Sequence, residues 1–277
     1  MREKTPRFLI GHGERLTREE PYVSGPKPAK PPPYPEEETR VRLTSKLDRV
    51  LAAAKALPAS ALPGGRLVAM VSLHPEFLAK SYFPSTLFGE LGLRAVGSRA
   101  RKIEPEKWSK PRKPGQSEAS ETIELYLAGR TDGFENWIDC LRGEGVSDKF
   151  IAESGRVEDL RPIQDLNAKG RLGHGMETEG ELVLEAALHA PEDLHQVLID
   201  AFKRHAHSLR ARIHEEAIVG VPGMLFIPLR VDGAAVEDLA DFTFLRTLRP
   251  VANLRPLPGP GITRSLGRPF TPPHAPH

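Results

Sequence analysis

The pattern of apolar and polar residues predicts a first set of alternating helices and strands. From Glu36 the spacing of apolar residues becomes helical, at about 3.6 residues per repeat, and it stays so until Pro58. Beyond this helix, strands are expected at 66–72, 93–103, 122–127 and 157–163, and helices at 76–91 and 134–141. Pro84 is expected to kink or split the helix at 76–91 because proline disrupts a helix interior.

The same order of elements recurs in the second half of the chain. The pattern predicts strands at 181–189, 211–220, 224–231 and 245–248, and helices at 191–210 and 236–241. Each half therefore has the order βαββαβ, which favours an α+β fold made of two tandem ferredoxin-like units. A single larger α+β sheet built from both halves is the alternative that the pattern leaves open.

Proline clusters indicate where the chain is divided. The 27 prolines gather at 21–35, 105–114 and 250–276, which is typical of linkers and tails. We expect extended Pro-rich arms at both ends of the chain. The expected divisions are a Pro/Lys-rich arm at 1–40, a linking helix at 41–60, a first unit at 61–165, a second unit at 166–250 and a tail at 251–277.

Composition narrows the classes of protein only slightly. The 39 Lys and Arg residues against 37 Asp and Glu residues leave a net charge of +2, too small to indicate a nucleic-acid partner. Cys140 is the single cysteine, so no disulfide framework is expected, and we expect it to be a buried structural thiol. No apolar run is long enough for a signal peptide or a membrane span, so we expect a cytoplasmic protein without membrane contact.

The histidines do not form a metal-binding pattern. His205 and His207 lie two residues apart on the predicted helix, so they point in nearly opposite directions and cannot share an ion. We expect both on a solvated face, opposite an apolar stripe that includes Leu198, Ala201 and Phe202. No metal and no other cofactor is expected.

The basic segment 94–113 is the best candidate for a binding surface. Its members include Arg99, Arg101 and Lys102, with Trp108 beside them, and such a combination can hold a nucleic-acid backbone or another polyanion. Glutamates and prolines interrupt the cluster, however, which favours a solvated hairpin loop. A nucleic-acid partner therefore stays the less favoured alternative.

Four motifs together resemble one family. They are Gly11–Leu16, Ser72–Pro84 (which reads SLHPEFLAKSYFP), Gly97–Arg99 and Phe242–Arg246. They are similar to the N-terminal, non-catalytic region of a group of bacterial subtilisin-like serine peptidases, and the second motif is the most specific. The residues expected to contact a partner are His74, Pro75, Lys80, Ser81, Tyr82, Phe83, Arg99, Arg101, Lys102 and Trp108.

The resemblance implies a role beside a catalytic domain rather than catalysis by this sequence. In such peptidases the catalytic domain follows the segment similar to 246–255, and the gene often neighbours one for an AAA ATPase in bacterial defence modules. The catalytic motifs Asp-Ser/Thr-Gly, His-Gly-Thr and Gly-Thr-Ser-Met do not occur in this sequence, so no catalytic residue is expected.

A subtilase propeptide is itself ferredoxin-like, packs its sheet on the peptidase and leaves its C-terminal tail in the cleft. By this analogy the second unit is propeptide-like. Its tail would place Leu254, Arg255, Pro256 and Leu257 in the cleft of the peptidase as an added strand.

The sequence thus predicts a cytosolic regulatory region that binds, chaperones or inhibits a subtilisin-like catalytic domain in cis or in trans, with an AAA ATPase as a further expected partner. A polyanion sensor working through 94–113 is the alternative. A hydrolase built on His74, Lys80 and Ser81 is a third, but His74-Pro75 is better explained as a helix cap.

Overall fold

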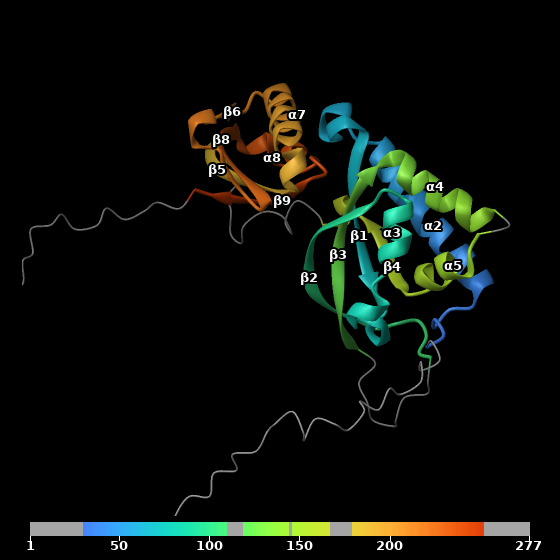
Figure 1. Ribbon diagram of the computed structural model, residues 1–277. Coiled ribbons are helices and arrows are strands. Elements are labelled where there is room, and N and C mark those ends of the chain that lie inside the picture. Colours follow the sequence, from blue (N-terminus) through green and yellow to red (C-terminus); the bar gives the residue numbers. More distant parts are fainter. Residues whose placement is uncertain (1–29, 110–118, 144–145, 167–178, 252–277) are drawn as a thin grey trace, which may run out of the picture.

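The computed structural model describes residues 30–109, 119–143, 146–166 and 179–251. Within these ranges the chain forms two antiparallel sheets, each with helices on one face, so the fold is α+β (Figure 1). The alternative of one continuous sheet is wrong, because no strand of the first sheet pairs with a strand of the second among these residues. No helix in the described ranges has both the length and the apolar character needed to cross a membrane.

A long helix, α2 (Glu36–Lys55), leads into the first sheet. Three glutamates occupy its first turn and Lys55 its last, an arrangement that complements the helix dipole. Its buried stripe consists of Leu43, Leu47, Val50, Leu51 and Ala54. The helix begins where the sequence pattern places it and packs across one face of the first sheet, beside α4 (Thr131–Arg142) (Figure 1).

The first sheet has the strand order β2-β3-β1-β4, and every neighbouring pair is antiparallel. The strands are β1 (Arg66–Leu73), β2 (Arg94–Ile103), β3 (Ser120–Arg130) and β4 (Val157–Pro162). Because successive side chains alternate between faces, Leu67, Ala69, Val71 and Leu73 of β1 point toward the helices and form one core with them. Two shorter helices, α3 (Ser85–Glu90) and α5 (Asp148–Ser154), complete this layer.

The second sheet repeats the plan with the order β6-β8-β5-β9, and β7 also pairs with β8. Its strands are β5 (Glu181–Ala190), β6 (Arg212–Ile213), β7 (Val219–Val221), β8 (Gly223–Asp232) and β9 (Leu245–Pro250), and its helices are α7 (His195–Ser208) and α8 (Val236–Leu239). Leu184, Ala186 and Leu188 point from β5 into a core with Leu198 and Phe202 of α7. The apolar stripe predicted for this helix is therefore confirmed at Leu198, Ala201 and Phe202.

The two units share buried surface. Val68, Met70, Tyr126 and Ala128, which point away from α2, belong to the same core cluster as the second sheet and its helices. Helix α7 packs against the turns at 59–65 that precede β1. Across this junction the Thr243 hydroxyl lies 3.1 Å from the backbone oxygen of Ala61 and 3.3 Å from that of Arg66.

Two predicted elements are wrong in their extent. The helix predicted at 76–91 is broken into two 3₁₀ turns, Pro75–Phe77 and Lys80–Tyr82, followed by α3. The split expected at Pro84 is confirmed, because proline keeps the preceding residue out of the helical region, and Phe83 is extended with ψ of 129°. The strand predicted at 211–220 is interrupted by the 3₁₀ turn Glu215–Ala217 and survives as the short strands β6 and β7.

Candidate functional site

The face of the first sheet that points away from α2 is divided into an apolar part and a charged part. The apolar part lies against the second unit, as described above. Farther along β3, the fully buried carboxylate of Glu124 sits among three guanidinium groups. Its oxygens lie 2.5 Å from Arg99, 2.9 Å from Arg101 and 2.6 Å from Arg161. The paired charges offset the desolvation of Glu124, since an unpaired buried carboxylate would be very costly.

We call this set the arginine face: Arg99, Arg101, Arg161, Glu124 and Asp159. Arg101 and Arg161 also approach Asp159, at 3.4 Å and 3.1 Å. Three cations against two carboxylates leave one excess positive charge. Arg99 keeps the greatest side-chain exposure of the three, at 40%. The arginine face is therefore rigidly held, weakly cationic and open to solvent at Arg99.

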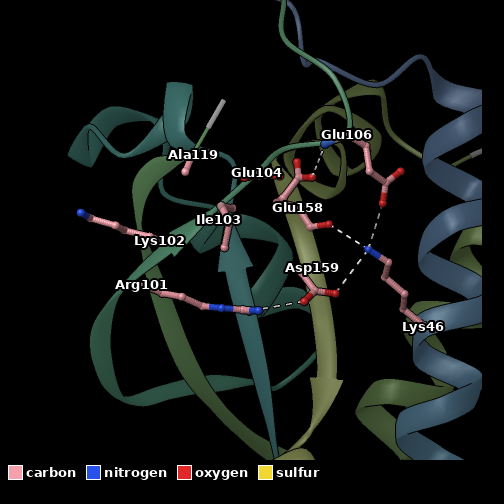
Figure 2. Close-up of a pocket in the computed structure, with 9 residues that line it drawn as sticks. All are labelled: Lys46, Arg101, Lys102, Ile103, Glu104, Glu106, Ala119, Glu158 and Asp159. Carbon is pink, nitrogen blue, oxygen red and sulfur yellow. Dashed lines mark hydrogen bonds and ion pairs between the residues drawn. The ribbon is translucent and has the colours of Figure 1, made fainter. Parts of the chain in front are cut away.

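A cavity of about 520 Å³ adjoins the arginine face (Figure 2). Its charged lining consists of Lys46, Arg101, Lys102, Glu104, Glu106, Glu158 and Asp159. Figure 2 shows the Lys46 ammonium between two carboxylates, 3.7 Å from Glu106 and 3.4 Å from Asp159, while Lys102 points away from them. With three cations and four anions the cavity is not suited to a polyanion.

Within the described part of the basic segment, 94–109, four of the five cations are engaged in ion pairs. Arg94 pairs with Asp193 of the second unit at 2.9 Å and thereby keeps the pKa of that carboxyl below its usual range. Lys107 pairs with Glu38 of α2. The strand predicted at 93–103 is confirmed as β2, so the solvated hairpin loop does not extend over 94–103, and residues 110–113 lie outside the described ranges.

His74 is a buried structural residue. Its Nδ1 accepts a hydrogen bond from the Glu76 backbone N–H at 3.2 Å, and its Nε2 lies 2.8 Å from the backbone oxygen of Lys107. A neutral ring protonated on Nε2 satisfies both contacts. The ring is also in edge contact with Trp108, at 5.5 Å between centroids. His74 therefore caps the turn at Pro75–Phe77, as the sequence suggested, and joins it to the segment after β2.

Glu76 and Glu158 bind the neighbouring segments to this histidine. Burial acts to raise the pKa of Glu76, but hydrogen bonds from Ser109 and the charge of Lys30 outweigh it, so the pKa is lowered. The Tyr34 hydroxyl donates to Glu158 at 2.7 Å. Burial and then this hydrogen bond to a carboxylate raise the pKa of Tyr34 far above its usual range, so its hydroxyl stays neutral.

The other residues of the Leu-His-Pro motif do not form a catalytic constellation with His74. Lys80 and Ser81 are exposed on the second 3₁₀ turn, whereas both ring nitrogens of His74 are held by backbone groups. Tyr82 and Phe83 are half-buried, and Tyr82 packs edge-on against Phe77 at 5.2 Å. The residues of this motif therefore pack on one another and hold the connection between β1 and β2 in place.

His205 departs from the expected solvated face. It is 1% exposed, its Nδ1 lies 3.0 Å from the hydroxyl of Ser60, and its Nε2 lies 3.1 Å from the backbone oxygen of Asp238. Burial lowers the pKa of His205, and the hydrogen bond to Asp238 and the charge of Asp241 oppose this shift. His207 is exposed, as expected. His205 thus belongs to the junction between the units.

Sequence reasoning missed an apolar surface on the second sheet. The face of this sheet that points away from α7 carries Val183, Val219, Val221, Met224, Phe226 and Pro228, here called the valine face. The three valines are exposed by 43%, 53% and 39%. Val251, which is also exposed, is joined by its backbone N–H to the oxygen of Val183. The available signal was an apolar residue at an outward position of β5, since Val183 lies between Leu182 and Leu184, which both face the core.

The remaining expectations concern Cys140, metal binding and the C-terminal tail. Cys140 is partly buried at the rim of the first core rather than fully enclosed. Among the residues that the structure describes, no group of three or more His, Cys, Asp or Glu side chains is arranged to hold a metal ion. The expected cleft-binding residues Leu254, Arg255, Pro256 and Leu257 lie outside the described ranges.

Comparison with protein-family models and with curated proteins gives no match. Among solved structures, the chain is similar to an unknown protein from Galdieria sulphuraria with 9% sequence identity. That match covers 63% of this chain and 87% of the other and has a TM-score of 0.18, which is too low to support an argument about fold or function.

Proposed function

We propose that the chain is the regulatory, propeptide-like region of a subtilisin-like serine peptidase, and that its second unit binds the catalytic domain. The observation that carries the proposal is the valine face, the side of the second sheet without helices. On it Val219 lies opposite Phe226, Val221 lies opposite Met224, and Val183 is exposed farther along β5. Exposed apolar patches of this kind mark protein-binding surfaces. A propeptide uses the same side of its sheet to pack on the peptidase.

The connectivity of the two sheets supports ferredoxin-like units. In each unit the two outer connections are helical crossovers and the first strand lies beside the third and the fourth, giving the orders β2-β3-β1-β4 and β6-β8-β5-β9. The crossover in the first unit is mostly 3₁₀ turns with the short helix α3, so this unit departs from a regular version of the plan. We assign the propeptide-like role to the second unit because its α7 is a full helix.

The direct test is binding and inhibition. The full chain, produced separately from its cognate catalytic domain, is expected to bind that domain and to slow cleavage of a peptide substrate. Val183→Lys should weaken binding at least tenfold, because it places a charge in an apolar contact.

Val197→Lys on α7 is the matched control, since Val197 is exposed by 42% against 43% for Val183 but lies on the helical side of the unit. The proposal is contradicted if the catalytic domain does not bind, or if both variants weaken binding equally.

The polyanion alternative has less support. A nucleic-acid surface needs cations that are free to replace counterions. Here Arg94, Arg99 and Arg101 each face a carboxylate at 2.5–2.9 Å. Of the cations in β2, Lys102 alone is exposed and makes no ion pair with another described residue.

A further inference from the structure

The two edges of the first sheet differ in how they are covered. At the β4 edge, the backbone oxygen of Glu158 accepts hydrogen bonds from Arg42 at 2.7 Å and Lys46 at 2.9 Å, both from α2. At the opposite edge lies β2. Among the described residues, no backbone group outside β3 is hydrogen-bonded to 98–103. An edge of unpaired N–H and C=O groups is a ready template for another strand.

This open edge is bordered by cations on both faces of the sheet. Arg99 and Arg101 lie opposite Glu124 and Thr122 of β3, on the face that carries Glu124. Lys102 lies opposite Glu121 and therefore on the other face, where it is exposed. Glu124 holds both arginines in position, so ordering them for a ligand costs little further side-chain entropy.

From these observations we propose that the β2 edge between 98 and 103 binds an extended acidic peptide of a partner protein as an additional strand. Main-chain hydrogen bonds would supply the affinity. Acidic side chains at alternate positions of the peptide would lie beside Arg99 and Arg101, because alternate residues of a strand share a face. The one excess positive charge of the arginine face and the charge of Lys102 oppose pairing with a basic strand and favour an acidic one with few charges, which supplies the specificity.

This inference does not rest on the proposed function, since it concerns the first unit and the edge of a sheet rather than the valine face. Binding of the catalytic domain can fail while the acidic strand still binds, and the reverse also holds. The two proposals are therefore tested separately.

The experiment is a calorimetric titration of the full chain with an eight-residue peptide in which Glu alternates with Thr. We expect saturable binding that weakens as salt is added. The same sequence with all backbone amides N-methylated keeps every charge but cannot pair as a strand, and we expect no binding. A peptide with Lys in place of Glu should also fail to bind.

Variants of the chain test the residues involved. Arg99→Gln should weaken binding of the Glu-Thr peptide about fivefold, the effect of losing one exposed charge pair. Lys102→Glu should weaken it less, because Lys102 lies on the face that meets the Thr side chains and loses no direct charge pair. Arg204→Glu on α7, an exposed cation in the other unit, changes the charge as much as Lys102→Glu does and should leave the affinity unchanged. Thermal unfolding checks that each variant is folded. We expect Arg99→Gln to fold, because Arg101 and Arg161 still pair with Glu124.

Three results would overturn the proposal. They are the absence of binding up to millimolar peptide, equal binding of the N-methylated peptide, and an equal loss of affinity in Arg204→Glu. The last two would mean that charge attraction alone accounts for the interaction. In a separate titration with single-stranded DNA, tighter binding than that of the peptide would also overturn the proposal and assign the edge to a polyanion.

Discussion

At the residue scale, buried polar side chains hold distant parts of the chain together, and the protonation of His205 is linked to the stability of the fold. Its pKa lies below the ordinary value of 6.5 because burial disfavours the charged ring. The unfolded chain therefore binds more protons at this residue once the pH falls below about 6.5, so the free energy of unfolding decreases with acidification there. Above that pH the contribution is constant.

We expect urea-unfolding curves to show this loss between pH 7 and pH 5.5, with a slope of at most about 1.4 kcal/mol per pH unit from this residue. His205→Gln should flatten the dependence, whereas His207→Gln, an exposed neighbour on the same helix, should not. An unchanged pH dependence in His205→Gln would contradict the assignment. Glu76 does not interfere, since its ordinary value is 4.5 and its lowered pKa affects stability only at lower pH.

At the scale of elements, α2 is joined to the first sheet through the segment just before it. Tyr34 is fully buried, its hydroxyl donates to Glu158 on β4, and the guanidinium of Arg42 lies 3.6 Å from the centre of its ring. The Thr39 hydroxyl donates to the backbone oxygen of Tyr34. The start of the helix and the outer strand β4 are thus stabilised by one side chain.

Tyr34→Phe removes only the hydroxyl and should lower the free energy of unfolding by about 1.5–3 kcal/mol, because the buried carboxylate of Glu158 loses a hydrogen-bond donor. Urea denaturation measures the change. Tyr82→Phe is the control: Tyr82 is half-buried and, within the described part of the chain, its hydroxyl makes no hydrogen bond. Equal effects of the two substitutions would show that the contact with Glu158 is not what stabilises α2.

At the scale of the whole molecule, the shared core predicts that both units unfold together. Met70 and Tyr126 of the first sheet are buried with the core of the second, and Thr243 bridges the units. Both tryptophans, Trp108 and Trp137, lie in the first unit, so fluorescence reports on that unit alone while circular dichroism reports on both. The two signals should give the same denaturation midpoint. A separate transition seen only by circular dichroism would mean that the units unfold independently.

Local patterns were sufficient for most elements of the fold. The spacing of apolar residues located α2 and α7, and the alternation at Thr122–Leu127 located the middle of β3. The spacing of apolar residues gave a wrong helix at 76–91. There Pro75 and Pro84 bracket the segment 76–83, whose aromatic residues pack on His74 and on one another. Helical spacing alone could not show that Phe77 and Tyr82 meet through 3₁₀ turns.

The sequence by itself determined the α+β class, the succession of strands and helices and the separation into two halves, because these depend on residues close together along the chain. Only the tertiary structure decided which charges meet. Arg99, Glu124 and Arg161 come from three strands, and their pairing depends on the order β2-β3-β1-β4. The same holds for His205, whose burial requires the first unit beside α7. Contacts between distant segments depend on how the sheets are connected and packed, which spacing along the chain does not encode.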